Sequence, residues 1–376
     1  MKSKMQIQAT GAVFEGHDHK KDVFSSFPCL CRLQNGRIMA AFQNGIAKHD
    51  AACTVMLTHS EDGGRTWSRP DEPFREWASS KGYTAHLAYI SEISPGRLLA
   101  SIALCDHLGN PSLPLFNPET GGALPLLIGL AESSDEGKTW REPLVLKVKR
   151  FNDVPVPIMS PIVKASDGTL LLPFETSKNY YDSGRWEHYA ASLLSQDNGK
   201  TWDDVRIMAH DPENRIMYWD HRMVSLGDGR CLDFFYTFDN AAGKEISAHR
   251  SISLDGGRTW PEKPFDTGLP GQPWPVPLRG DEIVVLRVDR YGDGAIKANL
   301  SPDLGVTWSD ELMIYRHGSK VGKNDDTLTD NLNEQMMWCY GLVSGVAVGE
   351  REILAIWYCG APDATRIECA RISVQV

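Results

Sequence analysis

The sequence predicts an all-β fold, a single six-bladed β-propeller with four-stranded antiparallel blades over residues 1–376. Two observations lead to this prediction. An eight-residue motif, Ser-x-Asp-x-Gly-x-Thr-Trp, recurs five times, and a pair of apolar strands joined by a tight turn recurs six times. Each unit has the order strand, turn, strand, loop, strand, motif, strand, which is the order of a four-stranded propeller blade.

The eight-residue motif predicts a hairpin turn. Its five copies begin at Ser60, Ser133, Ser195, Ser253 and Ser301. Serine and aspartate side chains cap the backbone of their own turn, and glycine adopts the positive φ that such a turn needs. We therefore assign these residues a structural role and no part in catalysis.

The sixth unit is incomplete. From about Tyr340 onwards there is room for three strands only, and no copy of the motif follows. Residues 6–14 are strand-like and belong to no other unit, so we expect them to supply the outer strand of the last blade. This pairing would close the ring and cover a free sheet edge.

Composition limits the partners and the compartment. The net charge of −10 argues against binding to nucleic acid or to an anionic membrane, which leaves a glycan or a small sugar as the expected partner. The chain has no apolar run of about 18 residues that could span a bilayer. It also lacks the apolar stretch of a secretory signal. We expect a cytoplasmic protein, or a periplasmic or secreted one if a leader has been removed.

No metal or cofactor is assigned from the sequence. The eight cysteines occur without a CxxC pair, so we interpret them as reduced core residues. The eleven histidines show neither HxxxH nor HExxH spacing. Any metal site would therefore have to be assembled from different blades.

A binding site is expected at the end of the propeller opposite the motifs. There the inner strands begin, and the loops between the second and third strands of each blade gather around the axis. Histidines, carboxylates and aromatic residues converge at this end, a composition suited to sugar rings and hydroxyl groups. The candidates for substrate binding are His49, His86, His107, Glu175, His221, Arg222, Tyr236, Arg287, Arg290 and Trp338.

The motifs resemble the Asp boxes, or BNR repeats, of the sialidase (neuraminidase) superfamily, and the resemblance spans nearly the whole chain. It implies hydrolysis of a terminal nonulosonic acid by a tyrosine nucleophile, with a polarising glutamate, an aspartate acid/base and three arginines that hold the substrate carboxylate. By this resemblance Tyr340 is the nucleophile, Asp50 is the acid/base, and Asp220 stands where the family places its glutamate.

The arginines depart from the family pattern. Ser26-Phe27-Pro28 stands where family members begin the first blade with an arginine, and Tyr236 stands where the second arginine is expected. Only the third has candidates, Arg287 or Arg290, with Arg222 as a possible substitute. Neither serine nor tyrosine replaces the charge and fork geometry of a guanidinium. The chain is thus expected to be a divergent member, an exo-acting glycoside hydrolase for a sugar other than ordinary sialic acid.

Two alternatives stay open. The first is a lyase that eliminates from a uronic acid, with histidine and tyrosine as base and acid and Arg222 or Arg290 neutralising the carboxylate. The second is a propeller that binds a glycan without turning it over. Hydrolysis requires Asp50 and Tyr340 to face each other across the axis. The lyase hypothesis requires a histidine bonded to a tyrosine beside an arginine, and the binding hypothesis predicts a mouth filled by side chains.

Two long loops accompany the expected site. Residues 107–125 are rich in proline and apolar side chains, which is typical of a site wall or of a contact between copies in a homo-oligomer. Residues 317–335 are charged and precede Tyr340, so they form either a lid or a solvated linker.

Overall fold

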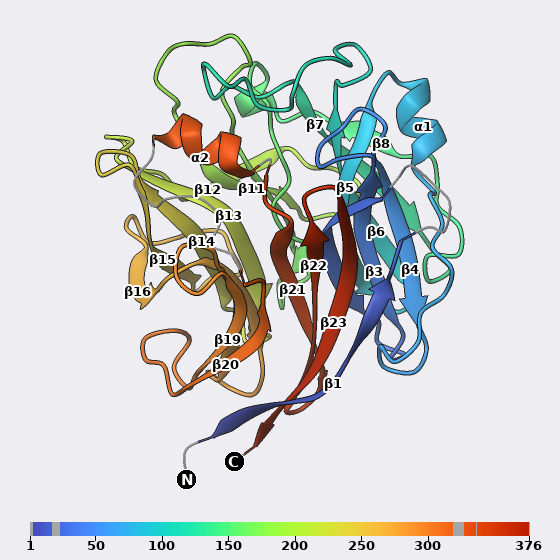
Figure 1. Ribbon diagram of the computed structural model, residues 1–376, viewed down its shortest axis with the longest axis vertical. Helices are drawn as coiled ribbons and strands as arrows, with labels where there is room; N and C mark the ends of the chain where they lie inside the picture. The colour runs from blue at the N-terminus through green and yellow to red at the C-terminus, as the bar shows by residue number, and fades with distance from the viewer. Residues whose placement is uncertain (1–2, 17–22, 319–326, 336, 376) are drawn as a thin grey trace.

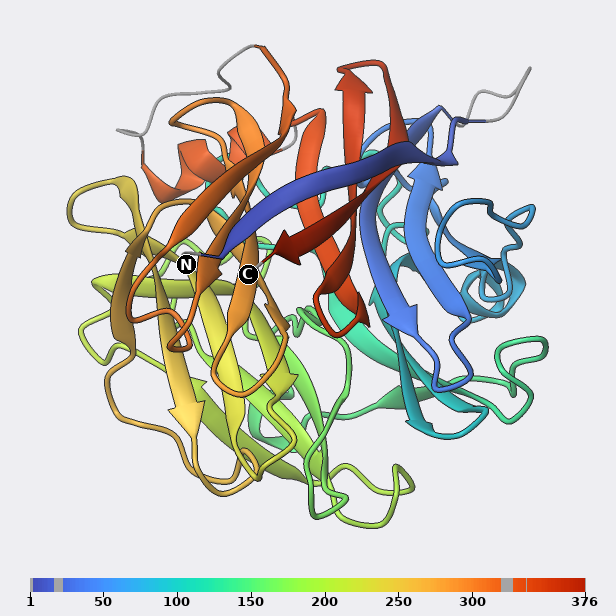
Figure 2. The ribbon, with the colours of Figure 1, turned by 90° about the horizontal axis from the view of Figure 1, so that it is seen from below.

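Six antiparallel sheets surround a central axis in this computed structural model, which describes residues 3–16, 23–318, 327–335 and 337–375 (Figure 1). The view along the molecule from below shows the sheets as blades of one ring (Figure 2). The predicted six-bladed propeller is therefore confirmed. Apolar side chains on the two faces of each blade pack against its neighbours and form the core.

In blades one to five the strands follow one another in chain order from the axis outward. Blade one contains β2 (Phe24–Arg32), β3 (Ile38–Gly45) and β4 (Thr54–Ser60). Blade two contains β5 (Thr84–Ser94), β6 (Arg97–Cys105), β7 (Leu126–Ser133) and β8 (Leu144–Leu146). Blade three contains β9 (Val163–Lys164), β10 (Leu170–Glu175), β11 (Ala190–Ser195) and β12 (Asp204–Ala209).

The second half of the ring repeats this plan. Blade four contains β13 (Ile216–Ser225), β14 (Cys231–Asp239), β15 (Lys244–Ser253) and β16 (Phe265–Leu269). Blade five contains β17 (Gln272–Pro277), β18 (Ile283–Asp289), β19 (Ala295–Ser301) and β20 (Asp310–Arg316). Blade six contains β21 (Tyr340–Gly349), β22 (Glu352–Ala361), β23 (Ala364–Gln375) and β1 (Lys4–Phe14).

The N-terminal strand closes the ring, as predicted. β1 pairs antiparallel with β23, from Lys4 opposite Gln375 to Phe14 opposite Ile367. Figure 2 shows the two strands side by side, with both chain ends next to each other. This pairing covers the outer edge of blade six and ties the start of the chain to its end.

Blade one departs from the four-stranded plan. Its outer edge carries a single antiparallel bridge, Leu57 to Asp71, in place of a fourth strand. Pro70 and Pro73 flank that bridge, and proline has no N–H to donate to a ladder. The chain then continues into the short helix α1 (Arg75–Ser80). A 3-10 turn at Lys149–Phe151 follows β8 in blade two.

Each Asp box forms the turn expected from its residues. In the fourth copy, Ser253 Oγ donates to Asp255 Oδ1 (2.7 Å) and accepts the Gly257 N–H (2.8 Å). The backbone and hydroxyl of Thr259 donate to the same carboxylate at 2.9 and 2.6 Å. Gly257 has a φ of +86°, and a Cβ there would overlap Leu171 of blade three. The boxes therefore join neighbouring blades as well as closing hairpins.

These boxes make stability depend on pH. The Thr139 hydroxyl lowers the pKa of Asp135 to about 2, and the Thr201 backbone N–H lowers the pKa of Asp197 to about 2. A carboxylate whose pKa is lower in the folded state stabilises the fold above the unfolded pKa, about 3.9, and loses this contribution as the pH falls towards 2. We expect Asp197→Asn to lower the melting temperature at neutral pH and to approach the wild type near pH 2.

Thermal unfolding followed by circular dichroism between pH 2 and pH 7 would measure this dependence. Asp363→Asn, at an exposed site remote from the boxes, is the matched control and should follow the wild type throughout. A deficit of Asp197→Asn that stays constant from pH 7 to pH 2 would show that the carboxylate charge contributes nothing.

The end of the propeller opposite the Asp boxes is covered. Helix α2 (Leu328–Gln335) and the loop between β6 and β7 both lie over this end (Figure 1). Leu332 of α2 packs in one cluster with Trp186, Trp219 and Phe116. In the part of the chain that the structure describes, no helix has the length and apolar character needed to cross a membrane.

Candidate active site

Four inner strands are interrupted by β-bulges where they reach the covered end. The bulges lie in β2, β5, β13 and β21, and they place Phe27, His86, Asp220 and Leu342 on the wall of one cavity. Three of these residues have positive φ angles, 52° at Phe27, 44° at Asp220 and 36° at Leu342. A bulge re-aims one side chain of a strand, and strained backbone of this kind gathers at functional sites.

The cavity lies on the axis and has a volume of about 130 Å³. Residues from all six blades and from α2 line it, and most of them are apolar or aromatic. The charged members other than histidine are Lys48, Glu175, Asp220, Arg222 and Arg290. An apolar pocket with a few convergent polar groups is the usual form of a small-molecule site.

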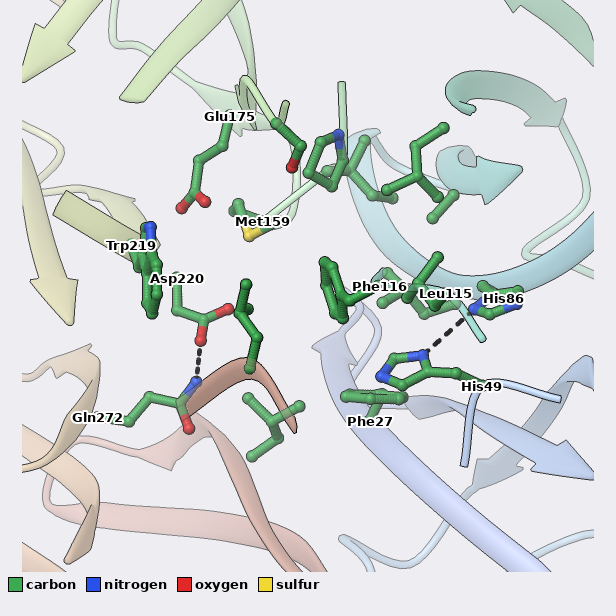
Figure 3. A pocket seen from close by; sticks show the side chains of 18 of the residues that line it. Phe27, His49, His86, Leu115, Phe116, Met159, Glu175, Trp219, Asp220 and Gln272 are labelled. Atoms are coloured by element: carbon green, nitrogen blue, oxygen red, sulfur yellow. Dashed lines mark hydrogen bonds between the residues drawn. The ribbon is translucent and has the colours of Figure 1, made fainter. Parts of the chain in front are cut away.

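Two carboxylates face this cavity from blades three and four. Glu175 ends β10 and Asp220 lies in the bulge of β13, and the two side chains lie on the same side of the cavity (Figure 3). Gln272 Nε2 donates to Asp220, and Arg222 Nη2 lies 3.6 Å from its carboxylate. Burial raises the pKa of Asp220; Arg222 opposes the rise, and the charge of Glu175 adds to it. Burial and the charge of Glu175 thus both make Asp220 take up a proton at a higher pH than an ordinary aspartate does.

Glu175 is held from behind by two histidines. His188 Nε2 lies 3.4 Å from one carboxylate oxygen, and the His221 backbone N–H donates to the other at 3.3 Å. The His221 ring contacts two acceptors, the Asp233 carboxylate through Nδ1 (2.9 Å) and the Phe174 carbonyl through Nε2 (3.1 Å). A ring protonated on both nitrogens would donate to both of these groups. Burial on its own would lower the pKa of His221, but the charge and hydrogen bond of Asp233 outweigh burial, and the net pKa is raised.

The two cavity arginines have different surroundings. Arg222 donates to the main-chain carbonyls of His221 (3.1 Å) and Met159, and its other nitrogen faces Asp220. Arg290 is 1% exposed and lies 3.7 Å above the Trp338 ring. Its Nη2 donates to Gln272 Oε1 at 3.1 Å, while its Nε and Nη1 have no hydrogen-bond partner among the described residues. Buried N–H groups of this kind can bind acceptor oxygens of a ligand.

The opposite wall is built from histidines and an aromatic ring. His49 Nδ1 lies 3.4 Å from His86 Nδ1 (Figure 3), and the other nitrogen of that ring, His86 Nε2, lies 3.0 Å from His107 Nδ1. The Phe27 ring packs on His49 with the centroids 4.8 Å apart. Burial lowers the pKa of His86 to about 3, so this wall is neutral at physiological pH.

A buried lysine completes the site. Lys48 Nζ donates to the Tyr358 hydroxyl at 3.3 Å and lies 5.3 to 5.6 Å from the ring centres of Phe27, Trp338 and Tyr358. Burial lowers its pKa well below the usual value, and the charge of Arg290 lowers it further. An amine with a lowered pKa can accept a proton near neutral pH.

The structure brings some of the predicted residues together and leaves others apart. The candidates that line the cavity are His49, His86, Glu175, Asp220, Arg222, Arg290 and Trp338. The candidates outside its wall are Asp50, His107, His221, Tyr236, Arg287 and Tyr340. Residues that sequence reasoning did not single out also line it, namely Lys48, Phe116, Trp186, Gln272, Leu332 and Leu342.

Neither Asp50 nor Tyr340 is among the described residues that line this cavity. The Asp50 carboxylate accepts backbone N–H groups of Ile46, Ala47 and Ala52 at 2.6 to 2.9 Å and so caps its own loop. Tyr340 is 0% exposed, belongs to the apolar core and stacks on His317. From blade six it is Leu342, two residues further on, that reaches the cavity.

Two more of the predicted site residues outside the cavity wall, Arg287 and Tyr236, contact residues elsewhere in the fold. Arg287 bonds to Glu311 (2.6 Å) and lies 3.4 Å from Asp289. Tyr236 is buried in β14 beneath Trp219, with the ring centres 6.3 Å apart. Of the long loops, residues 107–125 form part of the wall, through Leu115 and Phe116.

Similarities to known proteins agree with the fold. A family model described as a BNR repeat-like domain matches residues 110–260, whereas no curated protein sequence is significantly similar to the chain. A protein of unknown function from Dyadobacter fermentans DSM 18053 is 17% identical, with a TM-score of 0.73 and 99% of each chain covered. The intramolecular trans-sialidase from Ruminococcus gnavus is 14% identical, with a TM-score of 0.61 and coverage of 98% of this chain and 97% of that one.

An α-L-arabinanase from Penicillium chrysogenum is similar to the same degree, with 14% identity, a TM-score of 0.63 and 98% of each chain covered. Identities this low establish the fold and leave the activity open. The chain is thus a six-bladed β-propeller whose residues 110–260 match the BNR repeat-like model and whose fold is similar to that of the trans-sialidase and the arabinanase.

Proposed function

We propose that this protein is an exo-acting glycoside hydrolase for a sugar other than ordinary sialic acid. The observation that carries the proposal is the pair of carboxylates, Glu175 and Asp220, on one side of an axial cavity with aromatic walls. Glycoside hydrolysis commonly uses two carboxyl groups that flank the scissile bond. A cavity enclosed by six blades and α2 suits a terminal sugar better than the middle of a chain.

The two carboxyl groups have different surroundings, and we assign them different roles. Asp220, whose pKa is raised by burial, is the proposed general acid that protonates the leaving oxygen. Glu175, held by His188 and the His221 N–H, is the proposed base or nucleophile on the same sugar. These roles replace those that the family resemblance assigns to Asp50 and Tyr340, neither of which lines the cavity.

The arginines argue against ordinary sialic acid. Phe27 enters the cavity from the strand where the family carries its first arginine, and Arg222 is already engaged by two carbonyl groups and Asp220. Arg290 alone offers guanidinium N–H groups without a partner among the described residues of the cavity wall. A single guanidinium provides far less binding energy for a carboxylate than three that converge on it.

One observation favours elimination from a uronic acid as a second function. Lys48, whose pKa is lowered, contacts a tyrosine hydroxyl, and Arg290 shares the Trp338 ring with it. Such a lysine could take up the proton next to a sugar carboxylate that Arg290 neutralises. Elimination leaves an unsaturated, ultraviolet-absorbing product, whereas hydrolysis does not.

A panel of aryl glycosides tests the proposed function. It should contain an α-sialoside, several uronides and several neutral sugars. We expect cleavage of at least one glycoside other than the sialoside, and a loss of about 10²- to 10⁴-fold in kcat/KM on Glu175→Gln, the usual contribution of a positioned acid or base. Glu262→Gln, an exposed glutamate on the Asp-box face, is the matched control and should retain wild-type kcat/KM.

The other outcomes have distinct meanings. Rapid cleavage of the sialoside would contradict the inference drawn from the arginines. Full activity of Glu175→Gln would remove this residue from the mechanism. Binding of glycans without any turnover would replace the hydrolase by a non-catalytic glycan-binding propeller.

A further inference from the structure

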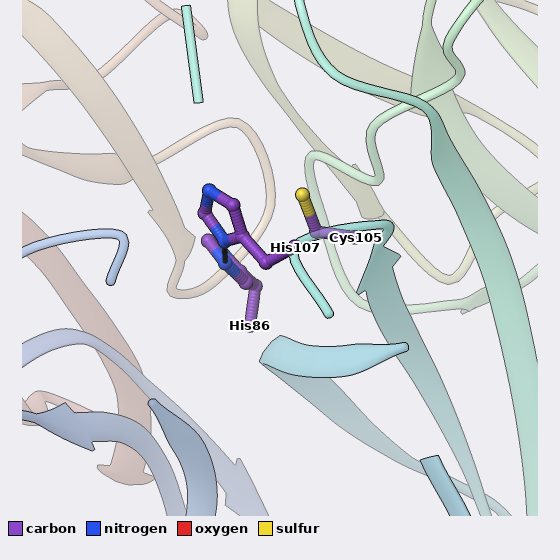
Figure 4. Close-up of side chains that lie close together, drawn as sticks. All are labelled: His86, Cys105 and His107. Carbon is purple, nitrogen blue, oxygen red and sulfur yellow. Dashed lines mark hydrogen bonds between the residues drawn. The ribbon is translucent and has the colours of Figure 1, made fainter. Parts of the chain in front are cut away.

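A cluster of nitrogen and sulfur donors lies behind the histidine wall of the cavity. It consists of His86 in the bulge of β5, Cys105 at the end of β6, and His107 two residues beyond it (Figure 4). The ligand atoms of these three residues all lie within 4.8 Å of one another. Their side chains are 2%, 0% and 1% exposed, so water does not surround the cluster.

We propose that His86, Cys105 and His107 bind a transition-metal ion of the Zn²⁺ type. Two imidazole nitrogens and one thiolate form a donor set that zinc accepts, and oxygen-preferring cations such as Mg²⁺ and Ca²⁺ do not suit it. The site extends beyond the proposed hydrolysis, because neither Cys105 nor His107 lines the sugar cavity.

The two histidine nitrogens are already at a separation close to that of two ligands of one ion. His86 Nε2 and His107 Nδ1 are 3.0 Å apart. Two nitrogens bound at about 2.0–2.1 Å in a tetrahedron lie roughly 3.3 Å from each other. The ion would thus replace the contact between the two rings, and the Cys105 thiol would lose its proton on binding.

The backbone explains why these donors meet. Cys105 ends β6, and the turn that follows at residues 106–107 keeps His107 beside it. β5 and β6 pair from Thr84 opposite Cys105, and the bulge between Ala85 and Leu87 turns His86 towards them. The cluster therefore belongs to blade two alone, whereas the histidine and cysteine spacings in the sequence predict that any metal site combines several blades.

The proposed metal-binding ring of His86 also has a hydrogen-bond partner on its other side. The other ring nitrogen of His86, Nδ1, faces His49 Nδ1 at 3.4 Å. Metal-binding histidines usually donate their second N–H to a neighbour, which sets the ring orientation. Since His49 and His86 both line the cavity, a bound ion would hold this wall in position. Three protein ligands leave a fourth tetrahedral position for water.

Metal titration of the full chain tests the site without reference to glycoside turnover. After treatment with a chelator, the protein is titrated with Zn²⁺ against a chromophoric competitor, and with Co²⁺ while thiolate-to-cobalt absorption is recorded. We expect one equivalent per chain and a thiolate band. Cys105→Ala should abolish the band and weaken Zn²⁺ binding by more than about 100-fold, beyond the loss seen when only a ligand's hydrogen-bond partner is removed.

Cys231→Ala is the matched control, since Cys231 is an equally buried strand cysteine in blade four. It should bind both ions like the wild type. His107→Gln, checked for folding by circular dichroism, provides the second variant if Cys105→Ala does not fold, and it should weaken Zn²⁺ binding to a similar degree. Failure of the wild type to bind Zn²⁺, or tight binding with a thiolate band in Cys105→Ala, would overturn the proposal.

Discussion

Asp220→Asn should lower kcat/KM for the cleaved glycoside by about 10³-fold, within the range that general acid catalysis contributes. Asparagine can still accept the hydrogen bond of Gln272, so the wall of the cavity is conserved, but it has no proton of suitable acidity to donate. Initial rates over a range of substrate concentrations would separate this loss of kcat from a loss of binding. Asp363→Asn, at an exposed site, should be indistinguishable from the wild type.

The identity of the leaving group distinguishes an acid from a positioning residue. A very acidic phenol leaves a glycoside without being protonated. Asp220→Asn should therefore lose little activity on an aryl glycoside of such a phenol and much activity on an alkyl glycoside. The wild-type rate should fall as the pH rises through the pKa of Asp220, which burial places above the usual range for an aspartate. An equal loss on both glycosides would exclude Asp220 as the acid.

The fold could be predicted from the sequence because its evidence is local. Each Asp box contains the serine, aspartate and threonine that bond to one another within eight residues, as the box at Ser253 shows. No long-range contact is needed to form that turn. Five copies at irregular spacing then imply blades, since hairpins of this kind must bury both faces against neighbours. The closing strand, β1, was predictable because residues 6–14 had no other blade to join.

The site was less predictable because bulges decide which side chains enter it. Side chains alternate along a strand, so a displacement of one residue changes the face on which each lies. In blade six the bulge presents Leu342 to the cavity and leaves Tyr340 in the core. The same device presents Phe27 and Asp220 in blades one and four. The residue types at these positions do not predict a bulge. Asp220 was selected through the family resemblance instead.

Loop geometry explains the remaining difference. Asp50 has the position along the chain that the resemblance requires, but its carboxylate binds three backbone N–H groups of its own loop. An aspartate that caps a turn and one that donates a proton look alike in sequence. Glu175, by contrast, ends a buried second strand at the covered end of the propeller, and that placement was enough to select it.

Gly271→Ala should destabilise the protein by about 3 kcal/mol or more, a size typical of strained backbone combined with steric overlap. Gly271 has a φ of +96°, which side-chain-bearing residues rarely adopt. A Cβ there would lie 2.5 Å from the Val288 carbonyl oxygen and 3.1 Å from its carbon. These are backbone atoms of β18, which pairs with β17 at this point, so they cannot move without breaking the ladder.

Gly268→Ala separates the free-energy cost of a left-handed backbone from the cost of steric overlap. Gly268 lies three residues earlier at a φ of +66°, and a Cβ there would meet no atom within 4 Å. Gly268→Ala should therefore lower the free energy of unfolding only by the cost of a left-handed backbone, about 1 kcal/mol. Urea unfolding at equilibrium measures both variants. Because Gln272 follows Gly271 and bonds to both Asp220 and Arg290, the alanine at 271 should also lower kcat in the molecules that remain folded. Equal free energies of unfolding for the two variants would show that β17 can shift at no cost. Gln272 would then not hold Asp220 and Arg290 in place.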